Sequence, residues 1–427
     1  MRLAHFVQRY PPALGGSESY FARLSRYLAA AGDRVSVFTT NALDLTAFWS
    51  SRGCCGSSGT THEEGVEVHR YPLVRWPGRR FSLKALSFIP NRFWQSLTLP
   101  CNPISWRMWS EAGSPRQSFD AVHATAFPYC WPIACGLRLA RRLRVPFLLT
   151  PFLHLGNHDD PGDRTRRAYL APPLLSLVRA AQHVFVQTCT ERAALIDQGI
   201  PEGKLCLLGM GVDPAECTGG DRERIRSQWA VRPDEVVIGH LANNSIEKGT
   251  VDLLRAAEQL WQRGIEFRLV LAGPVMPNFE RFWLRYPLAQ RVIRVGVLSE
   301  AHKRDFFAGI DLFALPSRSD SFGLVLLEAW ANGVPSVAYR AGGVADVIQH
   351  GKDGLLAPCD VGALAAALGQ LVKDEGLRRR LGASGCERTR GEFRWEDKLE
   401  RVRQVYCELI GNRRLQLGGD ARQAASC

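Results

Sequence analysis

The segment DLFALPSRSDSFGLVLLEAWANGVPSVAY, residues 311–339, predicts the unit around which the rest of the chain is arranged. Its apolar start, Asp311 to Leu315, is typical of a short buried strand, and the polar stretch from Ser317 to Phe322 indicates an exposed loop. Gly323 allows backbone to approach a ligand closely, and the following eight residues have helix-forming composition until an Asn-Gly pair ends them. The free N–H groups at the start of such a helix favour an anion, above all phosphate.

Two acidic residues in this segment, Asp320 and Glu328, are separated by seven others. An acid one helical turn from a phosphate suggests a sugar hydroxyl as its partner. With the following AWANGVPSVA, the pair resembles the donor-site signature of family 4 glycosyltransferases. The resemblance implies a GT-B fold, in which two Rossmann-like domains face a central cleft, and a retaining, metal-independent transfer from a nucleotide sugar.

The resemblance also implies roles for individual positions. Asp320 would lie beside the transferred sugar, and Glu328 would bind the ribose hydroxyls of the donor. The family normally has Glu as its first acid, so Asp320 is a departure that shortens the reach of this side chain. The distal phosphate would be held by the backbone amides of four consecutive residues, Phe322, Gly323, Leu324 and Val325.

Further donor contacts are implied at the start of each half of the chain. Gly15 and Gly16 follow a first predicted strand and resemble the glycine pair that borders the sugar and phosphates across the cleft. Lys248, which precedes a glycine, fits the family's diphosphate-binding Lys. His240 stands where the family has Arg, and a neutral His supplies one donor where Arg supplies five and a fixed charge.

A histidine is implied at the reaction centre. The segment TPFLHLGNH follows a predicted strand, and its His154 resembles the acceptor-cleft His of the family, with His158 as a rival. The resemblance therefore names His154, Lys248 and Asp320 as the catalytic set. Because the sequence has no D-x-D motif, we expect neither a metal nor another cofactor.

The alternation of strand and helix patterns predicts two parallel-sheet α/β domains. Gly209 and Gly211 allow the hinge dihedrals that closure of a cleft requires, so we place the boundary near residue 210. The expected division is an acceptor-binding domain at 1–209, a nucleotide-sugar-binding domain at 210–392, and a crossover helix with a loose tail at 393–427. Residues 41–65, rich in Gly and Ser, are expected to form a mobile excursion.

Composition favours a globular protein: 427 residues, 46% of them hydrophobic and 22% charged, suffice for two ordinary domains. No apolar run reaches the roughly 18 residues of a membrane-spanning helix, and no signal-peptide pattern is present, so we expect a cytoplasmic protein. The twelve cysteines include no C-x-x-C pair, which argues against a structural metal.

The positive charge is uneven, because residues 1–205 carry 24 basic and 14 acidic side chains of a chain whose net charge is +12. Such an excess favours an anionic partner. Residues 75–109 interleave Trp and Phe with Arg75, Arg79, Arg80 and Lys84, which is typical of a segment peripheral to an anionic membrane but also of acceptor-site or plain core helices. No recognised nucleic-acid-binding motif is present, so we expect no nucleic acid partner.

The resemblance thus implies a hexosyltransferase-type enzyme that moves a sugar from a nucleotide sugar to a saccharide, such as a lipid-linked or envelope saccharide of polysaccharide biosynthesis. Two alternatives stay open. A catalytically silent nucleotide-sugar-binding subunit would explain His240 and Asp320, and a nucleotide-sugar epimerase would share the fold.

Overall fold

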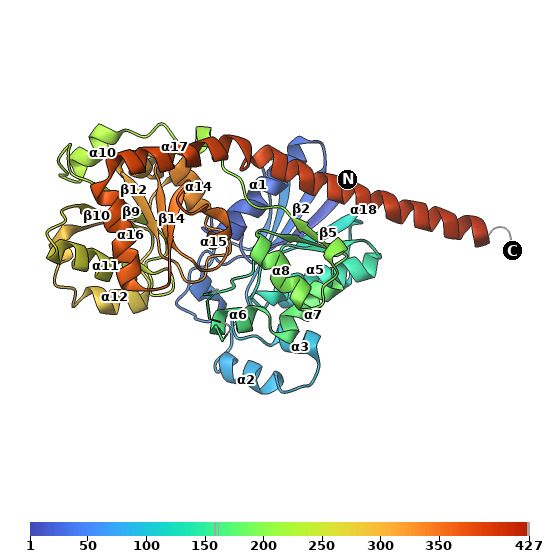
Figure 1. Ribbon diagram of the computed structural model, residues 1–427. Coiled ribbons are helices and arrows are strands. Elements are labelled where there is room, and N and C mark those ends of the chain that lie inside the picture. Colours follow the sequence, from blue (N-terminus) through green and yellow to red (C-terminus); the bar gives the residue numbers. More distant parts are fainter. Residues whose placement is uncertain (158, 161, 425–427) are drawn as a thin grey trace.

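The computed structural model describes residues 1–157, 159–160 and 162–424, and it contains two sheets that lie side by side (Figure 1). The first has the strand order β3-β4-β2-β1-β5-β6-β7-β8, and the second has the order β11-β10-β9-β12-β13-β14. The first-sheet strands are β1 (Arg2–Phe6), β2 (Arg34–Thr40), β3 (Gly59–Glu63), β4 (Val66–Tyr71), β5 (Ala121–Ala124), β6 (Phe147–Leu149), β7 (His183–Val186) and β8 (Leu205–Leu207). The second-sheet strands are β9 (Val237–Leu241), β10 (Arg268–Ala272), β11 (Val292–Gly296), β12 (Leu312–Leu315), β13 (Ser336–Tyr339) and β14 (Gly354–Ala357).

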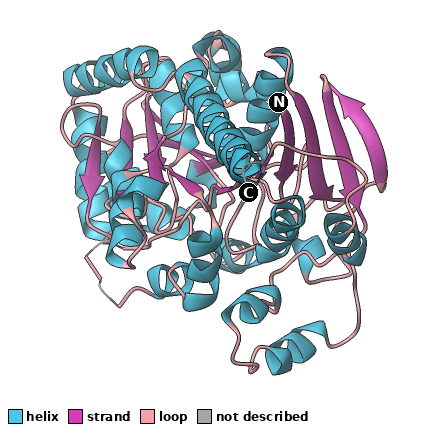
Figure 2. Ribbon diagram, turned by 90° about the vertical axis from the view of Figure 1, so that its right-hand side faces the viewer, coloured by secondary structure: helices cyan, strands magenta, loops and turns pink. Residues whose placement is uncertain are grey.

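Helices cover both faces of each sheet (Figure 2), as expected for parallel strands that are buried on two sides. Those of the first half are α1 (Gly16–Ala30), α2 (Arg79–Leu86), α3 (Arg92–Leu97), α4 (Trp106–Gly113), α5 (Cys130–Leu143), α6 (Arg164–Tyr169), α7 (Pro172–Ala180) and α8 (Cys189–Asp197). Those that follow are α9 (Pro214–Cys217), α10 (Arg222–Gln228), α11 (Thr250–Gln262), α12 (Pro277–Trp283), α13 (Glu300–Gly309), α14 (Leu324–Ala331), α15 (Val344–Val347), α16 (Val361–Lys373), α17 (Glu375–Gly391) and α18 (Trp395–Ala424). Short 3₁₀ turns occupy Leu45–Phe48, Glu202–Lys204 and Ala289–Arg291.

The pairing confirms the predicted two-sheet α/β architecture. Every strand pair is parallel except β3 with β4, which is antiparallel. Strand β3 falls inside residues 41–65, where the sequence suggested only a mobile excursion. Its five residues are almost wholly exposed, so they carry no apolar alternation that would have marked them as a strand.

The chain crosses between the two halves twice, and the two crossings touch. The first crossing follows β8, and the second joins α17 to α18. The amide of Val212 donates to the carbonyl oxygen of Phe393 at 2.8 Å, and Val212 also forms a parallel bridge with Arg394. Beside this contact, a Cβ on Gly211 would lie 2.8 Å from the backbone of Trp395, so the two segments are in direct contact.

Helix α18 then runs back along the first half (Figure 1). The sequence suggested a crossover helix followed by a loose tail within residues 393–427, but the helix continues to Ala424. Arg, Leu and Gln, which favour helices, dominate the extension, and two adjacent glycines weaken it without ending it.

A buried polar network fastens α18 to the first sheet. The hydroxyl of Tyr406 lies 2.6 Å from Nδ1 of His123 and 3.2 Å from Nε2 of His5. The remaining ring nitrogens reach the hydroxyls of Thr150 and Ser25, each at 2.8 Å. Burial lowers the pKa of His5 to about 3 and that of His123 well below its ordinary value, so both rings are neutral.

This network is expected to make stability depend on acidity. Because both histidines have a lower pKa folded than unfolded, the unfolded state binds more protons as the pH falls below about 6.5. Each buried ring should therefore remove up to about 1.4 kcal/mol of unfolding free energy per pH unit between about pH 6.5 and 4. Urea unfolding of the wild type and of His123→Asn across this range measures the effect, and equal slopes for the two proteins would contradict it.

Candidate functional site

The loop that follows β12 is the centre of the site. A second loop, which precedes α11, packs directly on it. Gly249 has φ +74°, and a Cβ there would lie 1.9 Å from the carbonyl oxygen of Pro316, so only glycine permits this approach. The contact places Nζ of Lys248 2.5 Å from Oδ1 of Asp320, two residues that lie 72 positions apart in the sequence.

Charge pairing decides the ionisation of Asp320. Its side chain and that of Lys248 are 18% and 23% exposed, so the pair is shielded from solvent without being sealed off. Burial alone would raise the pKa of Asp320, but the ammonium group of Lys248, together with His154 and Ser317, holds the pKa below its ordinary value. Asp320 is therefore a carboxylate at neutral pH, next to a fixed positive charge.

His154 reaches this pair from the first half of the chain. Its Nδ1 faces the backbone carbonyl oxygen of Ser319 and must donate to it, which leaves Nε2 as an acceptor. The ring packs against Tyr169, with centroids 4.9 Å apart. Burial, aided by the charge of Lys248, lowers the pKa of His154 to about 4, so the ring is neutral. The rival His158 lies outside the described residues.

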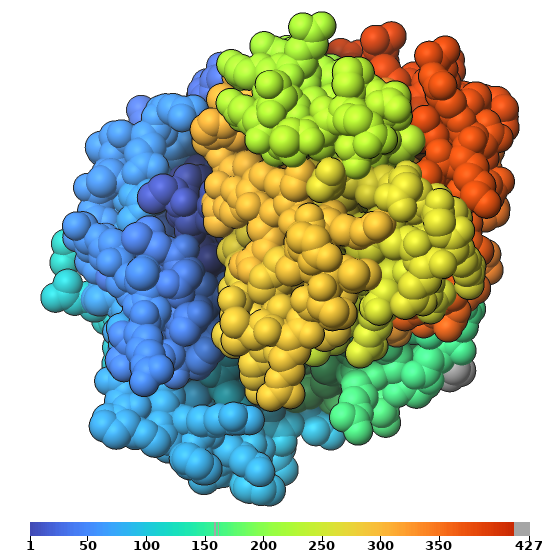
Figure 3. Space-filling model, turned by 90° about the vertical axis from the view of Figure 1, so that its left-hand side faces the viewer, coloured from blue at the N-terminus to red at the C-terminus, as the bar shows by residue number. Residues whose placement is uncertain are grey.

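The two halves are in contact across this centre. Besides His154, the amide of Gly342 donates to the carbonyl oxygen of Gly156 at 2.7 Å. Asp346 accepts from both the amide and the hydroxyl of Thr190, at 2.6 and 2.9 Å. In the space-filling view, the first-half surface lies next to the second, with a recess between them (Figure 3).

Glu328, the second acid, lies in α14 and has one unused oxygen. Its Oε1 is 2.7 Å from Nζ of Lys303 in α13, whereas its buried Oε2 has no hydrogen-bond partner among the described residues. Burial raises the pKa of Glu328, and the attraction of Lys303 only partly opposes the shift. A buried acceptor without a partner is costly, so this oxygen is suited to a ligand hydroxyl.

The start of α14 faces the predicted glycine pair. The first amides of the helix, which include those of Leu324 and Val325, have no intrahelical acceptor. A Cβ on Gly16 would lie 3.9 Å from Cδ1 of Leu324, which puts the loop after β1 opposite these amides. Gly15 immediately precedes it, while the Phe322 side chain is buried and leaves only backbone for a ligand.

His240 is not placed as the sequence suggested. It is fully buried on β9, with Nδ1 2.8 Å from the carbonyl oxygen of Ala314 and Nε2 3.0 Å from the hydroxyl of Thr250. Burial lowers its pKa to about 4, so the ring is neutral. Neither nitrogen is left for a diphosphate, contrary to the prediction of a donor contact, and the ring instead ties β9 to β12 and α11.

Replacing His240 by Arg, the residue usual in the family, is therefore expected to cost stability rather than raise turnover. A larger, charged side chain in this filled position should lower the unfolding free energy by roughly 1–3 kcal/mol from overpacking alone. Urea unfolding measures the loss, with His240→Gln as the control of similar size. Unchanged stability with faster transfer would show that the new guanidinium reaches the cleft.

Sequence patterns did not reveal two charged residues of the site. Lys303 pairs with Glu328 as described, and Glu191 supports the loop that carries His154. The Glu191 carboxylate accepts from the amides of Leu153 at 3.0 Å and Gln187 at 2.5 Å. Burial raises the pKa of Glu191 to about 7 despite these bonds. Both residues lie near helix starts, where acids and lysines are common on solvated faces, so nothing in the sequence singled them out.

The structure thus brings Lys248, Asp320 and His154 together, while their catalytic roles stay predictions. Within residues 1–157, 159–160 and 162–424, no three His, Cys, Asp or Glu side chains gather in a way that could hold a metal ion. In the same part of the chain, no helix has the length and apolar character needed to cross a membrane.

Comparison with known families identifies both halves. Residues 15–211 match the model described as glycosyl transferase 4-like domain, and residues 221–388 match that of glycosyl transferases group 1. A sulfoquinovosyl transferase of Arabidopsis thaliana is 27% identical over 418 residues, which cover 94% of this chain and 72% of that protein.

Solved structures share the whole arrangement. Sucrose-phosphate synthase from Thermosynechococcus elongatus superposes with a TM-score of 0.73 at 23% identity, covering 96% of this chain and 99% of its own. Anabaena HepE, solved in complex with UDP and glucose, gives a TM-score of 0.71 at 18% identity, covering 96% and 99%. These likenesses confirm the predicted GT-B fold.

Proposed function

The chain belongs to the group 1, family 4-type glycosyltransferases, and on that premise we propose that it transfers a sugar, with retention of configuration, from a nucleotide sugar to a saccharide acceptor. The observation that supports this best is the cluster of Lys248, Asp320 and neutral His154 beside the start of α14. HepE was solved with UDP-glucose as well, which makes a uridine donor the first to try.

The chemistry follows from the charges. Departure of a nucleoside diphosphate builds negative charge on a phosphate oxygen, and Lys248 and the free amides of α14 can stabilise it without a metal. We assign Asp320 to the transferred sugar and the unpartnered oxygen of Glu328 to the ribose. Nε2 of His154 can accept a hydrogen bond from a hydroxyl at the reacting face, while the donor phosphate takes the acceptor proton.

A panel of nucleotide sugars tests this proposal. NMR of the purified protein with each donor, with and without saccharide acceptors, should detect slow hydrolysis or transfer with one donor and an unchanged anomeric configuration. The same rate is expected in the presence of EDTA. Donor binding without turnover would favour a silent subunit, and donor conversion without an acceptor would favour an epimerase.

We further propose that the acceptor is lipid-linked and that the protein works at the cytoplasmic face of an anionic membrane. Helices α2 and α3 form a lobe at the edge of the molecule, where α3 packs on α7 (Figure 1). Phe81 and Phe88 on this lobe are 79% and 77% exposed, beside exposed Arg80 and Lys84. Exposed aromatics next to cations are typical of interfacial anchors.

Two of the four cations suggested by the sequence do not belong to this surface. The guanidinium of Arg79 is buried and donates to the backbone oxygens of Phe48 and Asn102. Arg75 donates to the carbonyl oxygens of Ser51 and Gly53, so it is bound to its own chain. The protein surface that we propose binds the membrane is therefore smaller than the sequence implied, and a larger share of it is apolar.

Sedimentation with vesicles is expected to separate these contributions. Replacing Arg80 and Lys84 by Ser should weaken binding to anionic vesicles by about 2 kcal/mol, since each cation contributes about 1 kcal/mol. Replacing Phe81 and Phe88 by Ser should weaken binding to anionic and neutral vesicles alike. Arg141→Ser/Arg142→Ser, on α5, is the control of equal charge. If the affinity for vesicles changes neither with lipid charge nor with either pair of substitutions, the membrane proposal is contradicted.

A further inference from the structure

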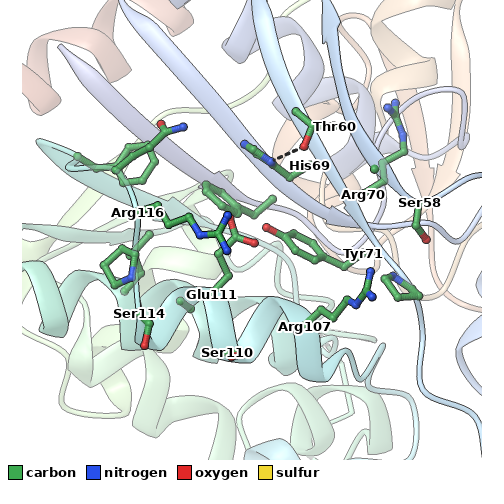
Figure 4. Close-up of a pocket in the computed structure, with 18 residues that line it drawn as sticks. Ser58, Thr60, His69, Arg70, Tyr71, Arg107, Ser110, Glu111, Ser114 and Arg116 are labelled. Carbon is green, nitrogen blue, oxygen red and sulfur yellow. Dashed lines mark hydrogen bonds between the residues drawn. The ribbon is translucent and has the colours of Figure 1, made fainter.

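A groove lies on the first half of the molecule, between the β3–β4 hairpin and α4 (Figure 4). It has a volume of about 680 Å³, within the roughly 300–1,000 Å³ of small-molecule sites. The hairpin forms one wall, and α4 with the segment up to residue 119 forms the other. None of the residues that line it belongs to the donor loop, to α14 or to the loop of His154.

Two guanidinium groups in this groove are unused. Arg107 and Arg116 are exposed, and neither side chain has an ion pair or hydrogen bond with any residue that the structure describes. Arg70, at the same groove, contrasts with them because it is bound to Glu63 at 2.7 Å. Glu111 is the one acidic side chain in the lining, so the groove has an excess of positive charge.

The floor of the groove holds a buried phenol beside a carboxylate. Tyr71 is 7% exposed, and its hydroxyl forms no hydrogen bond of good geometry, although the Glu111 carboxylate faces it. Burial, with the nearby Glu111 carboxylate, raises the pKa of this phenol, so it is a neutral donor. Because its contact with Glu111 is poorly aligned, a polar group of a ligand can offer this hydroxyl a better hydrogen bond. Ser58, Thr60 and Ser110 also line the groove, and the Thr60 hydroxyl lies 3.0 Å from Nδ1 of His69 (Figure 4).

The lining selects a class of ligand. The aromatic rings of Phe38, Tyr71 and Phe119 are buried, so the groove has no exposed ring on which a nucleobase could stack. The same burial leaves no exposed large apolar side chain in the lining for a lipid tail. Guanidinium forks bind carboxylate, sulfate or phosphate, and hydroxyl-rich walls match sugar hydroxyls.

We propose that this groove is a second carbohydrate-binding site, which takes an anionic saccharide through Arg107, Arg116 and the Tyr71 hydroxyl. Arg70 connects the groove with the donor cleft, because its Nη2 donates at 2.6 Å to the carbonyl oxygen of Pro11. Pro11 lies in the loop that leads to Gly15. A role as an outer subsite for a long acceptor rests on the proposed function, but binding itself does not.

Calorimetric titration of the full chain with trigalacturonate tests the site, with UDP at saturation to occupy the donor cleft. The fully methyl-esterified trisaccharide is the neutral probe of the same shape. We expect trigalacturonate to bind more tightly than the ester, and we expect its binding to weaken as the salt concentration is raised. Arg107→Ser/Arg116→Ser should weaken binding at least about tenfold, as expected when charged hydrogen bonds are lost. Arg263→Ser/Arg285→Ser, in the second half, is the matched control.

Tyr71→Phe separates hydrogen bonding to the sugar from electrostatic attraction. It should weaken binding of both trisaccharides while leaving the salt dependence of binding unchanged. The inference is overturned if trigalacturonate does not bind, or if the double Arg substitution has no more effect than the control. Competition by UDP would place the ligand in the donor cleft and also overturn it. Inorganic phosphate that binds as tightly as trigalacturonate would mean a simple anion site, which is not what we propose. None of these outcomes depends on turnover, so a failure here is distinct from a failure of the proposed reaction.

Discussion

Replacing Lys248 by Met is expected to lower kcat for transfer by about 10²–10³, the usual cost of removing one group that stabilises developing negative charge. The effect should fall on kcat more than on donor KM, because the charge on the leaving diphosphate grows as the bond breaks. Steady-state kinetics with the donor that the nucleotide-sugar panel identifies measures both. Lys303→Met removes a lysine of similar exposure from the ribose side, and it should alter donor affinity rather than kcat.

The same substitution should change the pH profile. In the wild type the ammonium group of Lys248 helps to keep the pKa of Asp320 below its ordinary value, so we expect protonation of this carboxylate to reduce activity only at acid pH. Without the ammonium, burial is opposed only by His154 and Ser317, so we expect the pKa of Asp320 to rise. The acid limb of the variant's profile should therefore move to higher pH. An equal loss of activity at all pH values, with an unmoved acid limb, would show that the two side chains are not coupled during turnover.

Replacing Glu328 by Gln is expected to weaken nucleoside diphosphate binding by about 1.5–3 kcal/mol, the value of a hydrogen bond to a charged group. This corresponds to a loss of affinity of roughly 10- to 150-fold. The reason is that Oε2 is buried and unpartnered, and a ribose hydroxyl would satisfy it. Gln preserves the size of the side chain, so the helix and its packing should remain intact.

A nucleotide without ribose hydroxyls provides the control. The wild type and Glu328→Gln should bind a 2′,3′-dideoxy nucleoside diphosphate with the same affinity, because the contact in question does not exist in either complex. Calorimetric titration with both nucleotides decides the assignment. If Glu328→Gln weakens binding of the dideoxy compound as much as binding of the ribose compound, Glu328 acts through Lys303 or the fold rather than through the ribose.

Local sequence patterns predicted those elements whose structure depends on residues close by in the sequence. The strand, loop and helix from Asp311 onward, and the turn at Lys248, carry their own signals in apolar runs and glycines, and the structure has both. What lay beyond prediction depends on partners far along the chain. Lys303 is recognised only when Glu328 is beside it. An arginine such as Arg79, which points inward to backbone oxygens, looks the same in the sequence as its exposed neighbour Arg80.

His240 illustrates the limit of carrying a motif from one member to another. The position matches the motif, but in this chain the ring is satisfied by a carbonyl on β12 and a hydroxyl on α11. A shorter, neutral side chain fits inside the sheet where a longer cation would have to reach the cleft. The pattern therefore located the residue correctly without establishing what it touches.

The paired crossings between the halves, joined at Val212 and Phe393, restrict how the molecule can open. Two domains joined by one linker can rotate about any axis, whereas two domains joined by two adjacent linkers rotate mainly about the axis through both. We therefore expect the cleft to open by rotation about this one hinge axis, and to bring His154 back to the same carbonyl oxygen each time it closes. The first half cannot be exchanged for that of a relative as one contiguous piece, because α18, which completes it, is encoded after the second half.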